Sequence, residues 1–170
     1  KPIDDRLVDW LFSNPVSDGG TFTGVADLVK KYGLVPREAM PETQSANATS
    51  QFNAQLKNVL REMGLHLRQM GEKGTSVKAL EEKKVEMLGK VYHMLTLAYG
   101  VPPTEFTWSQ RDKDGKVVST DKYTPLSFYN KLWGYDLNND YVLVMNDPSR
   151  EYYKVYQIEY DRHTYDGHDW

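Results

Sequence analysis

An α+β fold is predicted from three features of the 170-residue sequence. Apolar residues recur at helical spacing through two long stretches in the middle of the chain. In the last third, an Asp-Gly turn signal joins two segments that can pair as a β-hairpin. Further on, Tyr141–Met145 is a continuous apolar run, typical of a strand covered on both faces. Long helices followed by strand-like segments favour an α+β architecture.

The first fifty residues predict two helices and a loop. Residues 3–12 have helical apolar spacing, and Asn14-Pro15 ends this helix because a residue before proline avoids the α region. Asp18-Gly19-Gly20 predicts a turn. A second helix is expected from Phe22 to Tyr32, with Gly33 as its left-handed C-terminal residue. Residues 41–50 are polar and predict a loop.

The middle of the chain predicts two antiparallel helices over residues 46–99. Gly71-Glu72-Lys73-Gly74 interrupts the helical pattern, Ser76 is an N-cap candidate, and Gly100 precedes two prolines that stop the second helix. The stripe residues expected to seal this hairpin are Leu56, Leu60, Met63, Leu67, Leu88, Val91 and Leu95.

Four further residues of the hairpin are singled out by their chemistry. Gly64 and Gly89 each weaken a helix by roughly 1 kcal/mol relative to alanine, so they indicate close helix contacts. Met70 and Met87 are the candidates for apolar surface left over for a neighbouring molecule.

The last third predicts strands around one short helix. Residues 105–110 and 116–119 flank the hairpin turn. Thr124 is the expected N-cap of a short helix with Pro125 at its first position, and Gly134 is expected to end it. Tyr141–Met145 and Tyr152–Tyr160 are the expected strands, separated by a turn at Asn146-Asp147-Pro148.

Composition excludes several classes of protein. The formal net charge of −3 favours neither nucleic acid nor an anionic membrane as a partner. No apolar run reaches the 18 or so residues of a transmembrane helix. The sequence has no cysteine, which rules out disulfides and any thiol nucleophile within these residues.

Candidate chemical groups are few. His66 and His93 fall on the two long helices without an adjacent nucleophile, and we interpret them as ordinary helix residues. The stretch 161–169 places His163 and His168 among aspartates but fits no specific metal motif. Asp112–Gly115 resembles a calcium loop only in part, so the hairpin turn is the preferred interpretation. No metal, cofactor or catalytic residue is predicted, and the motifs alone leave the function open.

Several short motifs, in order and in register, carry a resemblance to a known family. They are Asn14–Gly20, Ala26–Pro36, Met40–Thr43, Pro102–Trp108, Arg111–Asp114, Thr124–Tyr129 and Asn146–Pro148. The sequence thereby resembles aminopeptidase C and bleomycin hydrolase, which are papain-like cysteine peptidases.

The resemblance implies a papain-like fold interrupted by a helical insertion. Residues 1–44 would belong to the helical domain of the peptidase, residues 45–100 would form the insertion, and residues 101–170 would lead through a β-hairpin, a short helix and strands into the barrel domain. The family's catalytic Cys, His and Asn would lie outside these residues. The chain is therefore expected to be an internal fragment, inactive alone.

For the intact protein, the resemblance implies a cytoplasmic thiol aminopeptidase that hydrolyses N-terminal residues from peptides. It also implies a homo-oligomer, with no cofactor and no membrane or nucleic-acid partner.

One functional element carries over residue by residue. In papain-like enzymes a glycine pair after a turn presents its backbone to the extended substrate, and Asp18, Gly19 and Gly20 match this element. Phe22 matches an aromatic residue near the substrate's second side chain. Thr21 departs from the family's usual Gln, as do the residues that follow Phe22, which leaves the specificity of the pocket open. The alternative interpretation of Asp18-Gly19-Gly20 is a simple turn that enters a helix.

A second class of function also stays open. The helical hairpin is compatible with a non-enzymatic module that binds copies of itself or another partner. Flanking sequence with Gln and Cys upstream and His and Asn downstream would favour the peptidase.

Overall fold

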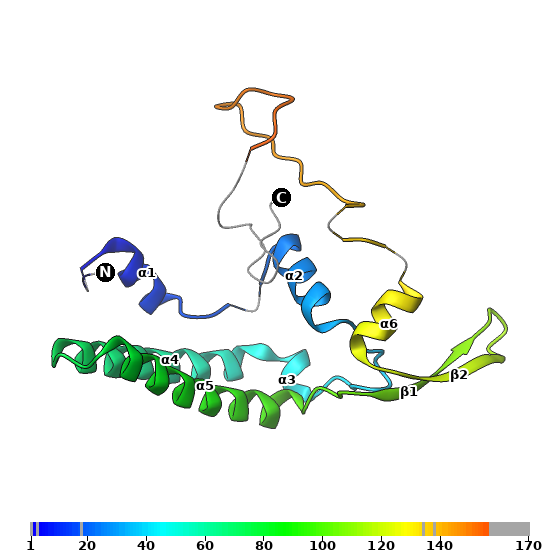
Figure 1. Cartoon of the computed structure of the whole chain (residues 1–170), viewed down its shortest axis with the longest axis horizontal. Helices are drawn as coiled ribbons and strands as arrows, with labels where there is room; N and C mark the ends of the chain where they lie inside the picture. The colour runs from blue at the N-terminus through cyan, green and yellow to red at the C-terminus, as the bar shows by residue number, and fades with distance from the viewer. Residues whose placement is uncertain (1, 3, 18, 134, 138, 157–170) are drawn as a thin grey trace. The chain divides into compact units, whose positions relative to one another are not determined.

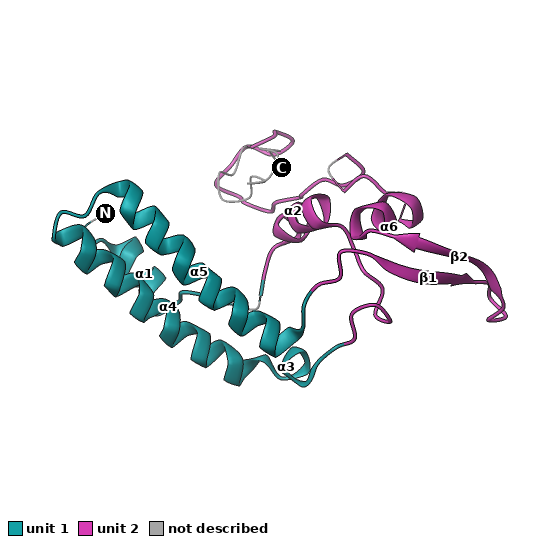
Figure 2. Cartoon of the chain, turned by 60° about the horizontal axis from the view of Figure 1, so that its bottom comes forward, with its two compact units in different colours: residues 1–19, 42–101 teal, residues 20–41, 102–170 magenta. Residues whose placement is uncertain are grey.

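The computed structural model describes residues 2, 4–17, 19–133, 135–137 and 139–156. The chain divides into two compact units, and Figure 2 colours them separately. Unit 1 comprises residues 1–19 and 42–101, and unit 2 comprises residues 20–41 and 102–170. We describe each unit by itself.

The described residues of unit 1 form four helices. They are α1 (Arg6–Ser13), α3 (Gln44–Asn47), α4 (Thr49–Glu72) and α5 (Val77–Tyr99). The long helices α4 and α5 lie side by side as an antiparallel hairpin (Figure 1). Ser76 caps α5, because its side chain accepts a hydrogen bond from the Ala79 amide at 3.3 Å. The predicted helical hairpin and its N-cap are therefore confirmed.

The face by which α5 packs against α4 differs in part from the predicted one. Leu56 of α4 is buried as expected, but on α5 the buried residue is Met87, whereas Leu88 is 50% exposed. The assignment of Met87 to leftover surface and of Leu88 to the seal was wrong. The cause is that α5 carries apolar residues on two adjacent faces, and spacing alone does not decide which face packs.

The polar residues 41–50 form the predicted loop only in part. Residues 41–43 and 48 are not helical, but α3 occupies residues 44–47 and α4 begins at Thr49. Thr43 explains the difference, since its side-chain oxygen accepts from the Ala46 amide at 3.2 Å and its hydroxyl donates to the Ala98 carbonyl of α5 at 2.8 Å. Short polar side chains usually predict a loop, but in this segment one of them caps a helix.

The first helix of unit 2 and its β-hairpin match the prediction. Helix α2 spans Phe22–Tyr32, and strands β1 (Phe106–Arg111) and β2 (Val117–Tyr123) pair antiparallel. At the turn, the Asp112 carboxylate accepts hydrogen bonds from the backbone amides of Asp114 and Lys116. This confirms the predicted hairpin turn.

The short helix α6 (Pro125–Leu132) has the predicted N-cap. The side chain of Thr124 accepts from the Ser127 amide, and the Ser127 hydroxyl accepts from the Thr124 amide, so the two residues form a capping box. Gly134, the predicted end of this helix, lies outside the described residues.

The core of unit 2 lies between α2 and α6. Ala26, Tyr129 and Leu137 are buried together, with Val29 and Leu34 packed against them. The hydroxyl of Tyr129 donates to the Tyr135 carbonyl at 2.9 Å, so this buried polar group is satisfied.

Gly33 joins α2 to α6 by direct backbone contact. Its φ of 79° and ψ of −161° lie in a region that is essentially restricted to glycine. The next amide, from Leu34, donates to the Pro125 carbonyl at 3.1 Å. A Cβ atom on Gly33 would lie 2.2 Å from the backbone of Pro125.

The predicted strands after α6 are absent from the described residues. Tyr141–Met145 has no regular secondary structure, with Val142 and Val144 almost fully exposed, and residues 152–156 form a turn and irregular backbone. A strand requires a hydrogen-bonded neighbour, and β1 and β2 pair only with each other in the described part of the chain. The rest of the second predicted strand, residues 157–160, lies outside the described residues.

None of the helices in the described residues is both long and apolar enough to cross a lipid bilayer.

Candidate functional site

The candidate site is the segment that connects α1 to α2. It contains Gly19, whose amide donates to the Ser17 hydroxyl at 3.2 Å, and Gly20. Both glycines are exposed to solvent. Asp18, the third residue of the predicted turn, lies outside the described residues.

The two glycines have no conformational reason to be glycine in this chain. The glycines with positive φ in the described residues are Gly33, Gly74, Gly100 and Gly115, so neither Gly19 nor Gly20 is among them. A Cβ atom on Gly20 would meet no other atom within 4 Å. Gly20 therefore offers an exposed backbone, and among the described residues it takes part in no hydrogen bond.

Phe22 is held at the start of α2 by local capping. The side chain of Thr21 accepts from the Gly24 amide at 3.4 Å and pairs with the Thr23 hydroxyl at 2.8 Å. Thr23 and Ala26 turn into the unit and are buried, which leaves Phe22 on the outer side of the helix, 40% exposed. The centroid of its ring lies 5.6 Å from that of Tyr141.

The segment starts at a helix end that is fixed by α4. The Arg61 guanidinium donates from Nε to the Phe12 carbonyl at 2.7 Å and from Nη2 to the Ser13 carbonyl at 2.9 Å. A Cβ atom on Gly64 would come within 2.9 Å of the Phe12 ring, so this glycine permits close contact with α1. Gly89, by contrast, has open space around it.

Sequence reasoning missed Arg61. Its partners are backbone carbonyls about fifty residues away. Every residue has a backbone carbonyl, so no pattern of side chains in the sequence predicts these partners. The one available signal was the close approach predicted at Gly64.

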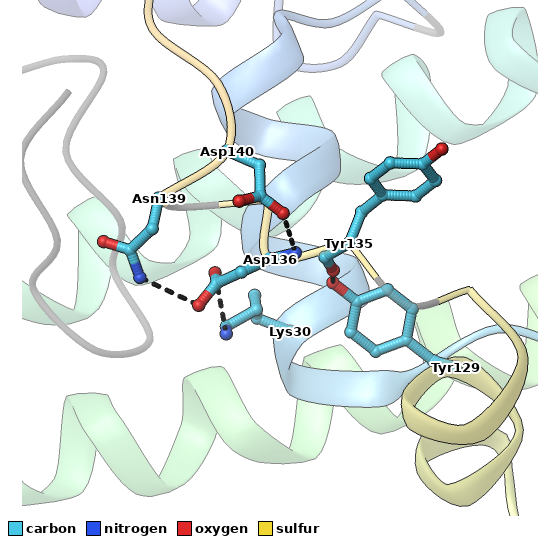
Figure 3. Close-up of polar contacts among 6 residues, drawn as sticks. All are labelled: Lys30, Tyr129, Tyr135, Asp136, Asn139 and Asp140. Atoms are coloured by element: carbon cyan, nitrogen blue, oxygen red, sulfur yellow. Dashed lines mark hydrogen bonds and ion pairs between the residues drawn. The ribbon is translucent and has the colours of Figure 1, made fainter.

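A second polar cluster lies in unit 2, where α2 and α6 meet the segment 135–140 (Figure 3). The Asp136 carboxylate accepts from Lys30 at 3.5 Å and from the Asn139 side-chain amide at 2.8 Å, and the Asp136 backbone amide donates to Asp140 at 2.7 Å. A pocket of about 250 Å³ lies beside Lys30 and Tyr129. Because these groups pair with one another, we assign the cluster to holding the segment on α2 rather than to chemistry.

The histidines do not form a site in the described residues. His66 and His93 are exposed on α4 and α5, as expected for ordinary helix residues. No group of three or more potential metal ligands occurs among the described residues. His163 and His168 lie outside those residues.

Comparison with known proteins identifies the family. The family model described as the Peptidase C1-like family matches residues 1–169. The chain belongs to this family. This agrees with the resemblance found from short motifs, and it places the α1–α2 segment within a peptidase sequence.

Two proteins similar to this chain are named aminopeptidase C and bleomycin hydrolase. The chain is 38% identical over 162 residues to aminopeptidase C of Lactobacillus delbrueckii subsp. lactis and 36% identical over 163 residues to bleomycin hydrolase of Gallus gallus. Each alignment covers 94% of this chain, which spans only 36% of the length of these curated relatives.

A solved structure supports the α+β fold. The crystal structure of PepW from Lactobacillus rhamnosis HN001 matches with a TM-score of 0.78 and 34% identity, over 82% of this chain and 31% of the PepW chain. The papain-like α+β class is therefore confirmed.

Proposed function

We propose that the intact protein is a thiol aminopeptidase and that residues 18–22 form part of its substrate-binding wall. Two curated relatives are named aminopeptidase C and bleomycin hydrolase. The observation that carries the assignment of the wall is Gly20. This residue is glycine although neither its backbone conformation nor its packing in the chain requires it. Close approach of an external backbone supplies the missing reason.

In the proposed reaction, this segment binds the peptide and groups from outside these residues cleave it. An extended peptide that lies along Gly19 and Gly20 would exchange backbone hydrogen bonds with them, as a strand does at the edge of a sheet. The exposed ring of Phe22 offers apolar contact for a substrate side chain. A thiolate activated by a histidine, both supplied from outside these 170 residues, would attack the carbonyl carbon of the first peptide bond. The C–N bond would break, the shortened peptide would leave as an amine protonated by the histidine, and the N-terminal residue would remain as a thioester on the enzyme. Water would then release the N-terminal residue.

Kinetics of the enzyme encoded by the whole reading frame test this assignment. Gly20→Ala adds a methyl group into open space, so the fold should be unchanged, but the peptide backbone would be held off. We expect KM for an aminoacyl fluorogenic substrate to rise about tenfold or more, because the lost backbone contacts are ones that the bound substrate already makes before it reaches the transition state. Gly24→Ala is the control, because its Cβ would make only an ordinary contact 3.7 Å from Thr21.

Unchanged KM in Gly20→Ala, in an enzyme that is active as wild type, would refute the assignment of the substrate wall. Absence of aminopeptidase activity from the wild-type enzyme would refute the reaction itself.

We also propose that the intact protein is a homo-oligomer assembled through the outer face of α5. Val85, Leu88 and Tyr92 follow one another at helical spacing, and each is at least half exposed. Soluble monomers rarely keep a continuous apolar stripe of this kind, so a second copy of the same face is the proposed partner. We place the protein in the cytoplasm, a proposal that rests on the family resemblance and is tested by cell fractionation.

A further inference from the structure

Phe22 is the first of three aromatic rings that contact one another in sequence. The centroid of its ring lies 5.6 Å from that of Tyr141, and the two ring planes are tilted by 51°. Tyr141 in turn contacts Tyr135, with ring centroids 6.5 Å apart. Tilted pairs at these separations are favourable aromatic contacts. All three residues belong to unit 2, so the contacts lie within one compact unit.

Polar contacts anchor the segment before Tyr141 to α2 and α6 (Figure 3). The Tyr135 carbonyl accepts a hydrogen bond from the hydroxyl of a buried tyrosine of α6 at 2.9 Å. The Asp136 carboxylate pairs with Lys30 of α2 at 3.5 Å, and the Asp136 amide donates to the Asp140 carboxylate at 2.7 Å. Tyr141 follows directly after Asp140, so these contacts support its position beside the first turn of α2.

The three rings are open to solvent as well as in contact with one another. Phe22 is 40% exposed and Tyr141 is 41% exposed, while Tyr135 is more than half exposed. Large apolar side chains that share one exposed patch indicate a binding surface, whereas scattered ones do not. The patch therefore offers an uncharged aromatic surface against which another side chain can pack.

The position of Gly20 indicates what this surface binds. Gly20 lies two residues before Phe22 in the same unit, and two residues of chain span at most about 7 Å. A peptide in extended form along the exposed backbone of Gly20 directs alternate side chains to the same side. One of its side chains can thus reach the rings of Phe22 and Tyr141 while its backbone contacts Gly20.

We propose that Tyr141 is a specificity-determining residue, which completes with Phe22 a subsite for an aromatic or large apolar side chain of the peptide. Such a side chain gains from burial of its apolar surface and from contact between rings. An alanine side chain is too short to make these contacts. This inference rests on the proposed contact between the substrate and Gly20.

The enzyme encoded by the whole reading frame tests the proposal with two matched series of peptides. Phe, Arg or Ala occupies the first position in one series and the second position in the other. We expect kcat/KM of the wild-type enzyme to be about tenfold or more higher for the Phe peptide than for the Ala peptide in one series. The Arg peptides test the alternative that the rings attract a cation, and we expect them to be cleaved no faster than the Ala peptides.

Substitutions of Tyr141 should change this preference rather than the activity itself. Tyr141→Ala should lower the Phe-to-Ala ratio of kcat/KM about tenfold, because only the Phe peptide loses a contact. Tyr141→Phe keeps the ring and should keep the ratio. Tyr32→Ala is the matched control, since it removes an exposed aromatic side chain from the other end of α2, about 15 Å along the helix from Phe22. We expect its ratio to match wild type.

Nuclear magnetic resonance supplies a second readout that does not depend on activity. The 170-residue chain is titrated with N-acetylphenylalanine amide and, separately, with N-acetylalanine amide. We expect the first probe to shift the amide signals of Phe22 and Tyr141 more than the second does, and Tyr141→Ala to abolish the difference. This arm tests the subsite even if the intact protein proves not to be an aminopeptidase.

Four results would overturn the proposal. They are an unchanged Phe-to-Ala ratio in Tyr141→Ala, an equal fall of that ratio in Tyr32→Ala, a wild-type preference for the Arg peptides, and equal shifts with the two probes. If Gly20→Ala raises KM while Tyr141→Ala leaves the ratio unchanged, the substrate wall stands and the subsite alone is refuted. If the wild-type enzyme cleaves no peptide, the reaction is refuted and the titration decides the subsite.

Discussion

Gly33 is the residue at which conformation and packing both require the absence of a side chain. Its φ is positive, and a Cβ atom would lie within 2.4 Å of three backbone atoms of Pro125 and Leu126. Backbone atoms in a capped helix cannot move aside as the end of a flexible side chain can. The contact between the end of α2 and the start of α6 therefore depends on this glycine.

We expect Gly33→Ala to destabilise unit 2 by at least about 3 kcal/mol, because strain and a steric clash combine. Gly115→Ala is the matched control: Gly115 also has a positive φ, of 82°, but open space around it. Conformational strain alone should cost the control about 1 kcal/mol. Hydrogen exchange of the core amides of α2 and α6 measures both free energies. Equal losses in the two variants would contradict the packing argument.

Single residues also mark what the sequence could and could not predict. Gly33 was expected to have positive φ because it follows an amphipathic helix, and this is confirmed. Its contact with Pro125 was not predictable, since the two residues are far apart in the chain. The same limit hid Arg61, whose partners are backbone carbonyls. Gly19 and Gly20 were found only through family resemblance, because two exposed glycines have no signature of their own.

At the scale of the element, α5 has two adjacent apolar stripes. The buried residue is Met87, with Val91 and Met94 half-buried along the same side, while Leu88 lies on the exposed stripe. A shift of one position turns a helix by about 100°. Periodicity therefore predicted the helix and its bounds, but it chose the wrong stripe in part, because both fit the helical period.

Substitutions on the two stripes should differ clearly in how far they lower the free energy of unfolding of the hairpin. Met87→Ala removes a buried side chain from the hairpin and should lower its free energy of unfolding by about 2–4 kcal/mol. Leu88→Ala, one residue further on, should cost less than about 1 kcal/mol in the isolated chain at low concentration. Hydrogen exchange of the α4 and α5 amides gives both values. A larger loss from Leu88→Ala than from Met87→Ala would restore the original assignment of the faces.

The run Tyr141–Met145 shows a different limit of sequence reasoning. Its composition favours a strand, but strand formation depends on a partner rather than on the segment itself. In the described part of the chain it pairs with neither β1 nor β2. The β1–β2 hairpin was predictable because its turn places both partners next to each other in sequence.

At the scale of the whole molecule, the exposed stripe of α5 predicts self-association. Sedimentation velocity over a hundredfold range of concentration should show the 19.6 kDa chain shifting to larger species. Leu88→Glu places a charge in the centre of the stripe and should keep the chain monomeric, because an unpaired charge is costly in an apolar interface. The control is Glu82→Lys, which reverses an exposed charge that lies about 90° around α5 from the stripe. A single boundary at the monomer mass throughout would contradict assembly by the chain.

We propose above all that these 170 residues belong to a thiol aminopeptidase, that they supply part of its substrate-binding wall, and that its catalytic groups lie elsewhere in the intact protein. The most direct test compares the 170-residue chain with the product of the whole reading frame, using an aminoacyl fluorogenic substrate with and without iodoacetamide. We expect turnover only from the intact protein, abolished by alkylation of its thiol, and none from the cysteine-free chain, since loss of a nucleophile typically costs about a million-fold in rate. Turnover by the pure 170-residue chain, or turnover by the intact protein that resists iodoacetamide, would contradict the claim.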